Sequence, residues 1–167
     1  GRSGLPVVYL DFCYDRQDSD AVISDSYYGA YRLTNYLYEM GHRKIAFVGT
    51  LRASGSINDR YFGYAKSLME HGLMTRGDWI IGDRDETGQI DAERFFLLPE
   101  DMPTAFFCNC DLTASYLIRK LSAAGYRVPG DISVAGYDHF LYPGLCDVPL
   151  TTYEVDTKEM ARRGVRM

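Results

Sequence analysis

The sequence lacks several features that define common classes of protein. No hydrophobic run is long enough to span a bilayer, and no secretory signal peptide is visible. Basic residues do not predominate, because 18 lysines and arginines stand against 23 acidic residues, for a net charge of −5. This balance gives no electrostatic footprint for nucleic acid. G-x-S-x-G, H-E-x-x-H and P-loop motifs are also absent, so we predict no enzymatic activity, no catalytic residue, no metal and no cofactor.

Cysteine is scarce as well, with four residues at positions 13, 108, 110 and 146. Their spacing matches neither a disulfide framework nor a zinc site. Cys108 and Cys110 would point to opposite faces of a strand, which argues against joint metal ligation. We interpret the four as reduced thiols of a cytoplasmic protein. A nucleophile–base pair of Cys110 and His139 is an alternative, although no third orienting group can be recognised.

What the sequence does contain is a central segment that predicts a strand, a helix and a second strand. Thr104–Phe107 is a short hydrophobic run suited to a strand buried on both faces, and Ile132–Ala135 is a second one. Between them Asp111 is expected to cap a helix. The apolar face of that helix consists of Ala114, Leu117, Leu121 and Ala124. Two hydrophobic strands joined by a helix are expected to be parallel.

Polar residues follow each of these two strands. Asn109–Asp111 comes after the first strand and Tyr137–His139 after the second. In open α/β sheets, ligands bind at the carboxyl ends of the strands. The two polar segments therefore predict a binding site for a small molecule.

The same alternation of strands and helices extends through the rest of the chain. Further strands are expected at 5–12, 45–48, 79–81 and 150–155, and further helices at 25–40, 59–72, 90–98 and from Asp156. This order predicts an α/β fold with a doubly wound parallel sheet. The first strand has no helix before it and the last helix has no stop signal, so we expect a fragment that is truncated at both ends.

Five motifs, taken in order, resemble those of LacI/GalR-type bacterial transcription regulators. They are GHRKIAFVG (41–49), RYFGY (60–64), PTAF (103–106), VPGDISV with GYD (128–138) and PLTT (149–152). The resemblance implies a type I periplasmic-binding-protein-like effector domain with two lobes, which forms a homodimer. It assigns residues 1–40 to part of the N-terminal lobe, 41–150 to the C-terminal lobe and 151–167 to a return segment. The DNA-binding headpiece of such a regulator would lie outside this chain.

The resemblance also implies a set of residues that bind the effector. The positions that match are Ser54, Ser56, Arg60, Arg84, Cys110 and Asp138. Arg60 offers a fork of hydrogen-bond donors and Asp138 offers two acceptor oxygens, which together suit a polar metabolite such as a sugar. Two alternatives remain open, namely an ion pair of Arg60 on a helix surface and a turn-forming role for Asp138.

Two of these positions depart from the family pattern. Cys110 stands where the family often has asparagine, and a thiol is a poor hydrogen-bond partner. Arg84 lies in a charged loop where family members can place an aromatic residue, so an acidic or phosphorylated effector becomes conceivable. A solvated loop is the alternative interpretation of Arg84. Asp111, which is also part of the family pattern, is expected to act as a helix cap rather than as a ligand.

The hypothesis is therefore the effector-binding and dimerisation domain of a repressor that senses a sugar or related metabolite, with operator DNA bound only through the headpiece. A periplasmic sugar-binding protein of a transporter is the alternative. Residues 140–146 are apolar for a connecting loop. They predict either a surface for the partner subunit or a loop folded onto its own core.

Overall fold

The structure, a computed structural model, describes residues 7–11, 19–85 and 87–167. The chain forms two compact units, of which one comprises Ser26–Glu154 and the other combines Gly1–Asp25 with Val155–Met167. Part of the expected strand at 5–12 and the cysteine at position 13 lie outside the described residues.

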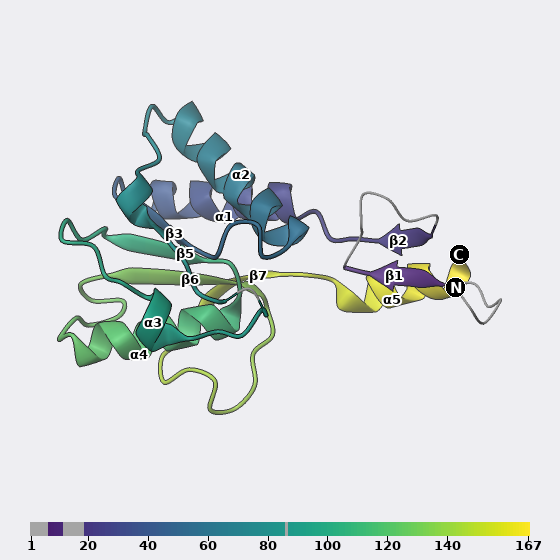
Figure 1. Ribbon diagram of the computed structural model, residues 1–167. Coiled ribbons are helices and arrows are strands. Elements are labelled where there is room, and N and C mark those ends of the chain that lie inside the picture. The colour runs from purple at the N-terminus through teal and green to yellow at the C-terminus, as the bar shows by residue number, and fades with distance from the viewer. Residues whose placement is uncertain (1–6, 12–18, 86) are drawn as a thin grey trace. The chain divides into compact units, whose positions relative to one another are not determined.

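The larger unit is built on a sheet of five strands (Figure 1). In spatial order these are β4 (Ile80–Ile81), β3 (Ile45–Val48), β5 (Ala105–Cys108), β6 (Ser133–Asp138) and β7 (Thr151–Glu154). Each adjacent pair is parallel, as expected when helices connect consecutive strands. The predicted α/β class with a parallel sheet is confirmed.

Helices cover both faces of this sheet (Figure 1). One layer is formed by α1 (Ser26–Glu39) and α2 (Gly55–Glu70), which pack closely against each other. At their contact a Cβ on Gly63 would lie 2.1 Å from the carbonyl oxygen of Tyr27, so only glycine permits this approach. The other layer is formed by α3 (Ala92–Phe95) and α4 (Asp111–Ala123).

The buried strands divide their side chains between these two layers. On β3, Ala46 and Val48 join a cluster with Leu117 of α4. Phe47 faces the other way, and its ring centroid lies 5.6 Å from that of Tyr64 in α2. Because residues of a strand alternate between faces, a fully buried hydrophobic run can line two cores at once.

Several element boundaries differ from the expected ones. The helix α2 begins at Gly55 rather than near residue 59, because Ser54 Oγ accepts a hydrogen bond from the backbone N–H of Ile57 at 3.2 Å and caps the helix. The strand β6 continues to Asp138 instead of ending at Ala135. Trp79 lies in a 3₁₀ turn (Gly77–Trp79) that precedes β4.

The smaller unit contains two parallel strands and one helix. β1 (Val8–Leu10) pairs with β2 (Asp20–Val22), and α5 (Thr157–Arg166) packs against both. Asp156 caps α5, as its position in the sequence predicts, by accepting from the backbone N–H of Glu159 at 2.8 Å. Within the part of the chain that the structure describes, no helix has the length and apolar character needed to cross a membrane.

The larger unit begins at Ser26 and ends at Glu154. The segments that the sequence analysis assigned to the lobes have their boundaries at residues 40 and 150 instead. The difference arises because α1 packs against α2 and therefore belongs to the larger unit. The assignment of these segments to the lobes of a two-lobed domain stays a prediction.

Candidate functional site

Arg60 and Asp138, two of the predicted site residues, lie in direct contact. Arg60 projects from α2 toward the carboxyl ends of β5 and β6, where Asn109 follows β5 and Asp138 ends β6. Its Nη1 donates to the carbonyl oxygen of Asn109 at 2.6 Å, and its Nη2 donates to Asp138 Oδ1 at 3.0 Å. The carboxyl ends of the two strands thus meet at one guanidinium group. Arg60 is 49 residues from Asn109 and 78 residues from Asp138 in the sequence.

The surroundings of Arg60 are unusual for a charged side chain. The residue is only 5% exposed, and its guanidinium carbon lies 4.0 Å from the centroid of the Tyr137 ring. Arg60 Nε is buried and has no hydrogen-bond partner among the described residues. The Asp138 side chain, by contrast, is 34% exposed. An ion pair on a helix surface is therefore wrong for Arg60, and Asp138 is the more accessible of the two groups.

Asp138 also has a backbone conformation that is rare for its residue type. Its φ is +96°, and that of the following His139 is +56°. Non-glycine residues at positive φ are strained and are found preferentially at functional sites. This conformation places the Asp138 carboxylate where it meets Arg60, so it accords with a role beyond that of an ordinary turn residue.

A second network surrounds a buried carboxylate that the sequence analysis did not single out. Asp83 is fully buried and accepts hydrogen bonds from the Thr50 backbone N–H at 2.9 Å, from Asn109 Nδ2 at 2.7 Å and from Thr113 Oγ1 at 2.7 Å. It also pairs with Arg84 Nη2 at 2.7 Å. Burial by itself would raise the pKa of Asp83, but the bonds from Arg84 and Thr113 hold that pKa below its ordinary value.

Arg84 connects this network to the residues beside Arg60. Its Nη2 donates to Asn109 Oδ1 at 3.1 Å and lies 3.7 Å from Cys110 Sγ. Burial acts to lower the pKa of the Arg84 guanidinium, but the bond to Asp83 outweighs it and raises that pKa. Asn109 therefore contacts Arg60 through its carbonyl group and Arg84 through its side chain. Arg84 belongs to an ordered cluster and not to a solvated loop.

The expected capping role of Asp111 is wrong. The residue at the N-cap of α4 is Cys110, and Asp111 is the first residue of the helix. Its buried carboxylate accepts from Thr152 Oγ1 at 2.6 Å and from the backbone N–H of Phe140 at 2.6 Å. These partners lie on later segments, so Asp111 ties α4 to the connections around β6 and β7. Burial raises the pKa of Asp111, although both hydrogen bonds act in the opposite direction.

The remaining predicted residues lie near this cluster in different roles. Ser54 caps α2, and Ser56 is a partly buried residue in its first turn. Cys110 Sγ lies 3.2 Å from Thr113 Oγ1, in addition to its contact with Arg84. His139 donates through its backbone N–H to Thr152 Oγ1 at 3.2 Å. Among the residues that the structure describes, no three histidine, cysteine, aspartate or glutamate side chains are grouped as metal ligands would be.

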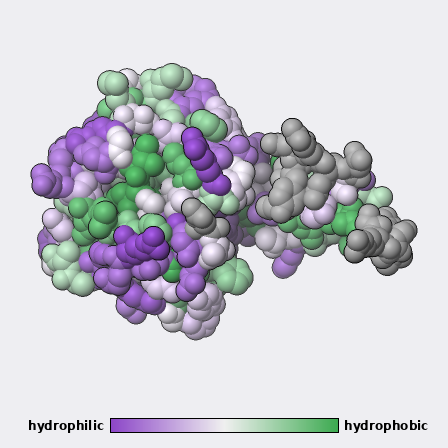
Figure 2. All heavy atoms as spheres, viewed as in Figure 1, coloured by the Kyte–Doolittle hydropathy of each residue, from purple (hydrophilic) through white to green (hydrophobic). Residues whose placement is uncertain are grey.

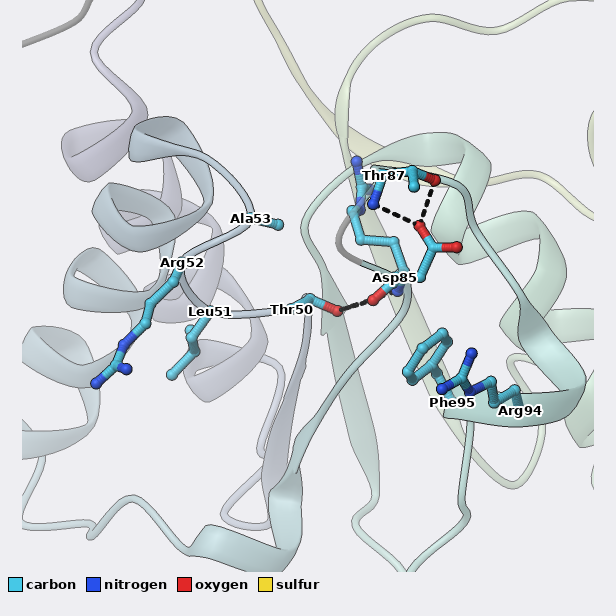
Figure 3. Close-up of a pocket in the computed structure, with 9 residues that line it drawn as sticks. Thr50, Leu51, Arg52, Ala53, Asp85, Thr87, Arg94 and Phe95 are labelled. Atoms are coloured by element: carbon cyan, nitrogen blue, oxygen red, sulfur yellow. Dashed lines mark hydrogen bonds between the residues drawn. The ribbon is translucent and has the colours of Figure 1, made fainter.

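A cavity of about 730 Å³ opens beside this cluster (Figure 3). It is lined by Thr50, Leu51, Arg52, Ala53, Arg84, Asp85, Thr87, Arg94 and Phe95. Figure 3 shows Leu51, Arg52 and Ala53 on one side and Asp85, Thr87, Arg94 and Phe95 on the other. Of the six predicted site residues, only Arg84 is among these described lining residues.

The comparisons with known proteins agree with this architecture. Residues 34–167 match the model of the periplasmic binding protein-like domain family. The chain belongs to this family. The resemblance to LacI/GalR-type regulators that the five motifs indicate is also confirmed, because the relatives and structures described next are repressors and LacI-family regulators.

Curated relatives of this periplasmic binding protein-like domain include two repressors. The HTH-type transcriptional repressor PurR of Aliivibrio salmonicida is 34% identical over 164 residues, which is 98% of this chain and 49% of that protein. The PurR of Mannheimia succiniciproducens is 31% identical over 99% of this chain and 50% of that protein. The chain therefore spans about half the length of the curated relatives that it matches.

Solved structures show the same domain. A transcription regulator from Lactobacillus plantarum has a TM-score of 0.81 at 26% identity, with 99% of this chain and 63% of that one covered. The CelR–cellobiose complex has a TM-score of 0.83 at 28% identity, with 98% and 51% covered. A LacI-family regulator from Lactobacillus casei with bound sucrose has a TM-score of 0.77 at 26% identity, with 95% and 60% covered. These relatives are named as regulators and not as enzymes.

Sequence reasoning missed two members of the cluster, Asp83 and Thr113. Both lie in the segments that it had singled out, because Asp83 follows β4 and Thr113 lies in the first turn of α4. An aspartate beside an arginine after a short strand is typical of a charged surface loop. No neighbouring residue in the sequence indicates that the Asp83 carboxylate is fully buried. The position of Asp83 at a strand end was the available signal.

Proposed function

We propose that this chain is the effector-binding and dimerisation part of a LacI/GalR-type transcriptional repressor. The observation that carries this proposal is the contact of Arg60 with Asn109 and Asp138 at the carboxyl ends of β5 and β6. Membership of the periplasmic binding protein-like family and the similarity to PurR repressors support it. Operator DNA would be bound by a headpiece outside these 167 residues, and the protein would act in the cytoplasm.

The effector would be a sugar or a related polar metabolite. Asp138 presents a partly exposed carboxylate that can accept hydrogen bonds from hydroxyl groups of a ligand. The buried Arg60 would orient this carboxylate through its Nη2 hydrogen bond. The sugars bound in the CelR and L. casei regulator structures support this class. Ser54, Ser56, Arg84 and Cys110 would surround the ligand at greater distance from Asp138.

Effector binding would favour one arrangement of the regulator over another and so change its affinity for the operator. The experiment uses the regulator that contains this chain together with its headpiece. A thermal-shift screen of sugars identifies an effector, and operator binding is then measured with and without it. We expect the Asp138→Asn variant to keep operator binding. Its affinity for the effector should fall by about tenfold to a hundredfold, because a hydrogen bond to a charged group is lost.

The matched control is Glu39→Gln, which removes an exposed carboxylate at the end of α1. This variant should respond to the effector as the unaltered protein does. An Asp138→Asn variant that binds the effector within about twofold of the unaltered protein would place the binding site elsewhere. A protein that binds sugars without any effect on operator binding would favour the transporter alternative.

A further inference from the structure

The cavity beside Arg84 differs in chemistry from the predicted effector contacts at Arg60 and Asp138. Among the residues that the structure describes, three arginines and one aspartate line it, and Phe95 provides an apolar wall. Figure 2 shows hydrophobic and strongly hydrophilic residues next to each other on the visible face of the larger unit. The volume of about 730 Å³ lies within the range of roughly 300–1,000 Å³ that is usual for small-molecule sites.

The charges around the cavity are not balanced among the described residues. The charge of Arg84 is matched by Asp83 at 2.7 Å. No ion pair between described residues includes Arg52 or Arg94. Asp85 is already engaged, because its Oδ1 accepts from the backbone N–H and the hydroxyl of Thr87 at 2.8 and 2.6 Å. The described lining therefore offers two arginines to a ligand, of which Arg94 already interacts electrostatically with Asp85.

The backbone holds these arginines in place on opposite sides of the cavity. Arg52 has a φ of +72°, and its backbone N–H donates to Asn58 Oδ1 at 2.9 Å, which stabilises this strained conformation. Arg94 lies on α3, and its guanidinium carbon is 5.0 Å from the centroid of the Phe95 ring. Both side chains are exposed and long enough to turn toward a bound anion, which guanidinium groups recognise through paired donors.

We propose that this cavity binds the anionic group of a small ligand, a phosphate or a carboxylate, with Arg52 and Arg94 as its contacts. Arg84 links the cavity to the effector site, because it lines the cavity and also bonds Asn109, which Arg60 contacts. The ligand is then an anionic effector such as a sugar phosphate or a sugar acid. Only this last step rests on the proposed function, since binding of the anion can be measured separately.

The test titrates the 167-residue chain with inorganic phosphate and follows backbone amide signals by NMR. We expect saturable shifts at residues 50–53 and 94–95. The double variant Arg52→Gln/Arg94→Gln should bind phosphate at least about tenfold more weakly. The matched control Arg32→Gln removes one exposed arginine on α1 and should bind as the unaltered chain does. Absence of saturable shifts at the cavity, or an equal loss in the control, would overturn the proposal.

Parallel titrations with gluconate and with glucose define the ligand class. Binding of phosphate but not of gluconate identifies a phosphate site. Binding of both identifies a general anion site. Binding of neutral glucose with the same affinity as phosphate would overturn the proposal. The Glu39→Gln chain, altered at an exposed position on α1, should retain phosphate binding. Failure of phosphate to bind would leave the effector contacts at Asp138 untouched, so this proposal and the proposed function fail in different measurements.

Discussion

Arg60 Nη2 donates to Asp138 Oδ1 at 3.0 Å, and this bond joins a buried helix residue to the partly exposed end of the β6 strand. The same guanidinium group donates to the Asn109 carbonyl oxygen. One side chain thereby fixes the ends of β5 and β6 relative to α2. Loss of the Arg60 contacts should therefore reduce the stability of the fold as well as ligand binding.

Replacing Arg60 with methionine should reduce the free energy of unfolding by about 2–3 kcal/mol. The change leaves the Asn109 carbonyl without its donor and the Asp138 carboxylate without its partner. Breaking a fully buried ion pair costs about 3–5 kcal/mol. A smaller loss is expected here because Asp138 is partly exposed to solvent. Urea denaturation measures the effect. Arg162→Met, at an exposed pair on α5, is the control and should change the stability by less than about 0.5 kcal/mol. An equal loss of unfolding free energy in Arg60→Met and Arg162→Met would show that the Arg60 contacts do not stabilise the protein more than an exposed ion pair does.

Gly136→Ala should destabilise the protein strongly. A Cβ at this position would lie 2.2 Å from Asp111 Oδ1, and Asp111 is held by Thr152 and Phe140. We expect a loss of about 1–3 kcal/mol or more, as for other overpacked sites. Gly55→Ala is the control, because nothing lies within 4 Å of its Cβ position. Thermal unfolding of both variants measures the difference, and a Gly136→Ala protein as stable as the control would show that the Asp111 carboxylate is free to move.

Stability should fall as the pH drops below about 6.5, with His42 contributing to the loss. His42 bridges Thr104 Oγ1 at 2.9 Å and Ser133 Oγ at 3.0 Å, and burial lowers its pKa. A group with a depressed folded-state pKa stabilises above its unfolded-state pKa, and this contribution is lost as the pH falls through the folded-state value. Denaturation between pH 7.5 and about 5 should therefore show a shallower pH dependence for His42→Gln. Identical slopes would assign the pH dependence to other groups.

Self-association should depend on the loop around Leu141 and Tyr142. Phe140, Leu141 and Tyr142 are 73%, 44% and 50% exposed, which leaves an apolar surface that a second copy can cover. Leu141→Glu/Tyr142→Glu should shift a dimer toward monomer in sedimentation velocity experiments, since burial of apolar surface contributes about 25 cal/mol per Å². Met74→Glu, at another exposed apolar residue, is the control. A dimer that survives the double change would place the interface elsewhere.

The sequence predicted the sheet because its strands are signalled locally. Ile45–Val48 and Ala105–Cys108 are short hydrophobic runs flanked by polar or glycine residues, and alternating helices require parallel pairing. The same reasoning located the polar strand ends from which Asn109 and Asp138 approach Arg60. Helix α2 begins earlier than expected because residues 53–57 have the small, polar character of a loop, although a serine such as Ser54 is also a capping signal for a helix.

What the sequence by itself determined is the class of fold, the strand ends that carry the site and the resemblance to a family of regulators. What only the tertiary structure decided is which side chains meet there. Asp111 was expected to bond within its own helix, but Thr152, 41 residues later, supplies its donor. The buried Asp83 has a lowered pKa because Arg84, Thr113 and Asn109 donate to its carboxylate, and the backbone N–H of Thr50 donates to it as well. Local patterns fix the path of the backbone, whereas the partner of a buried charge is set by whichever distant donor the packed sheet brings within about 3 Å.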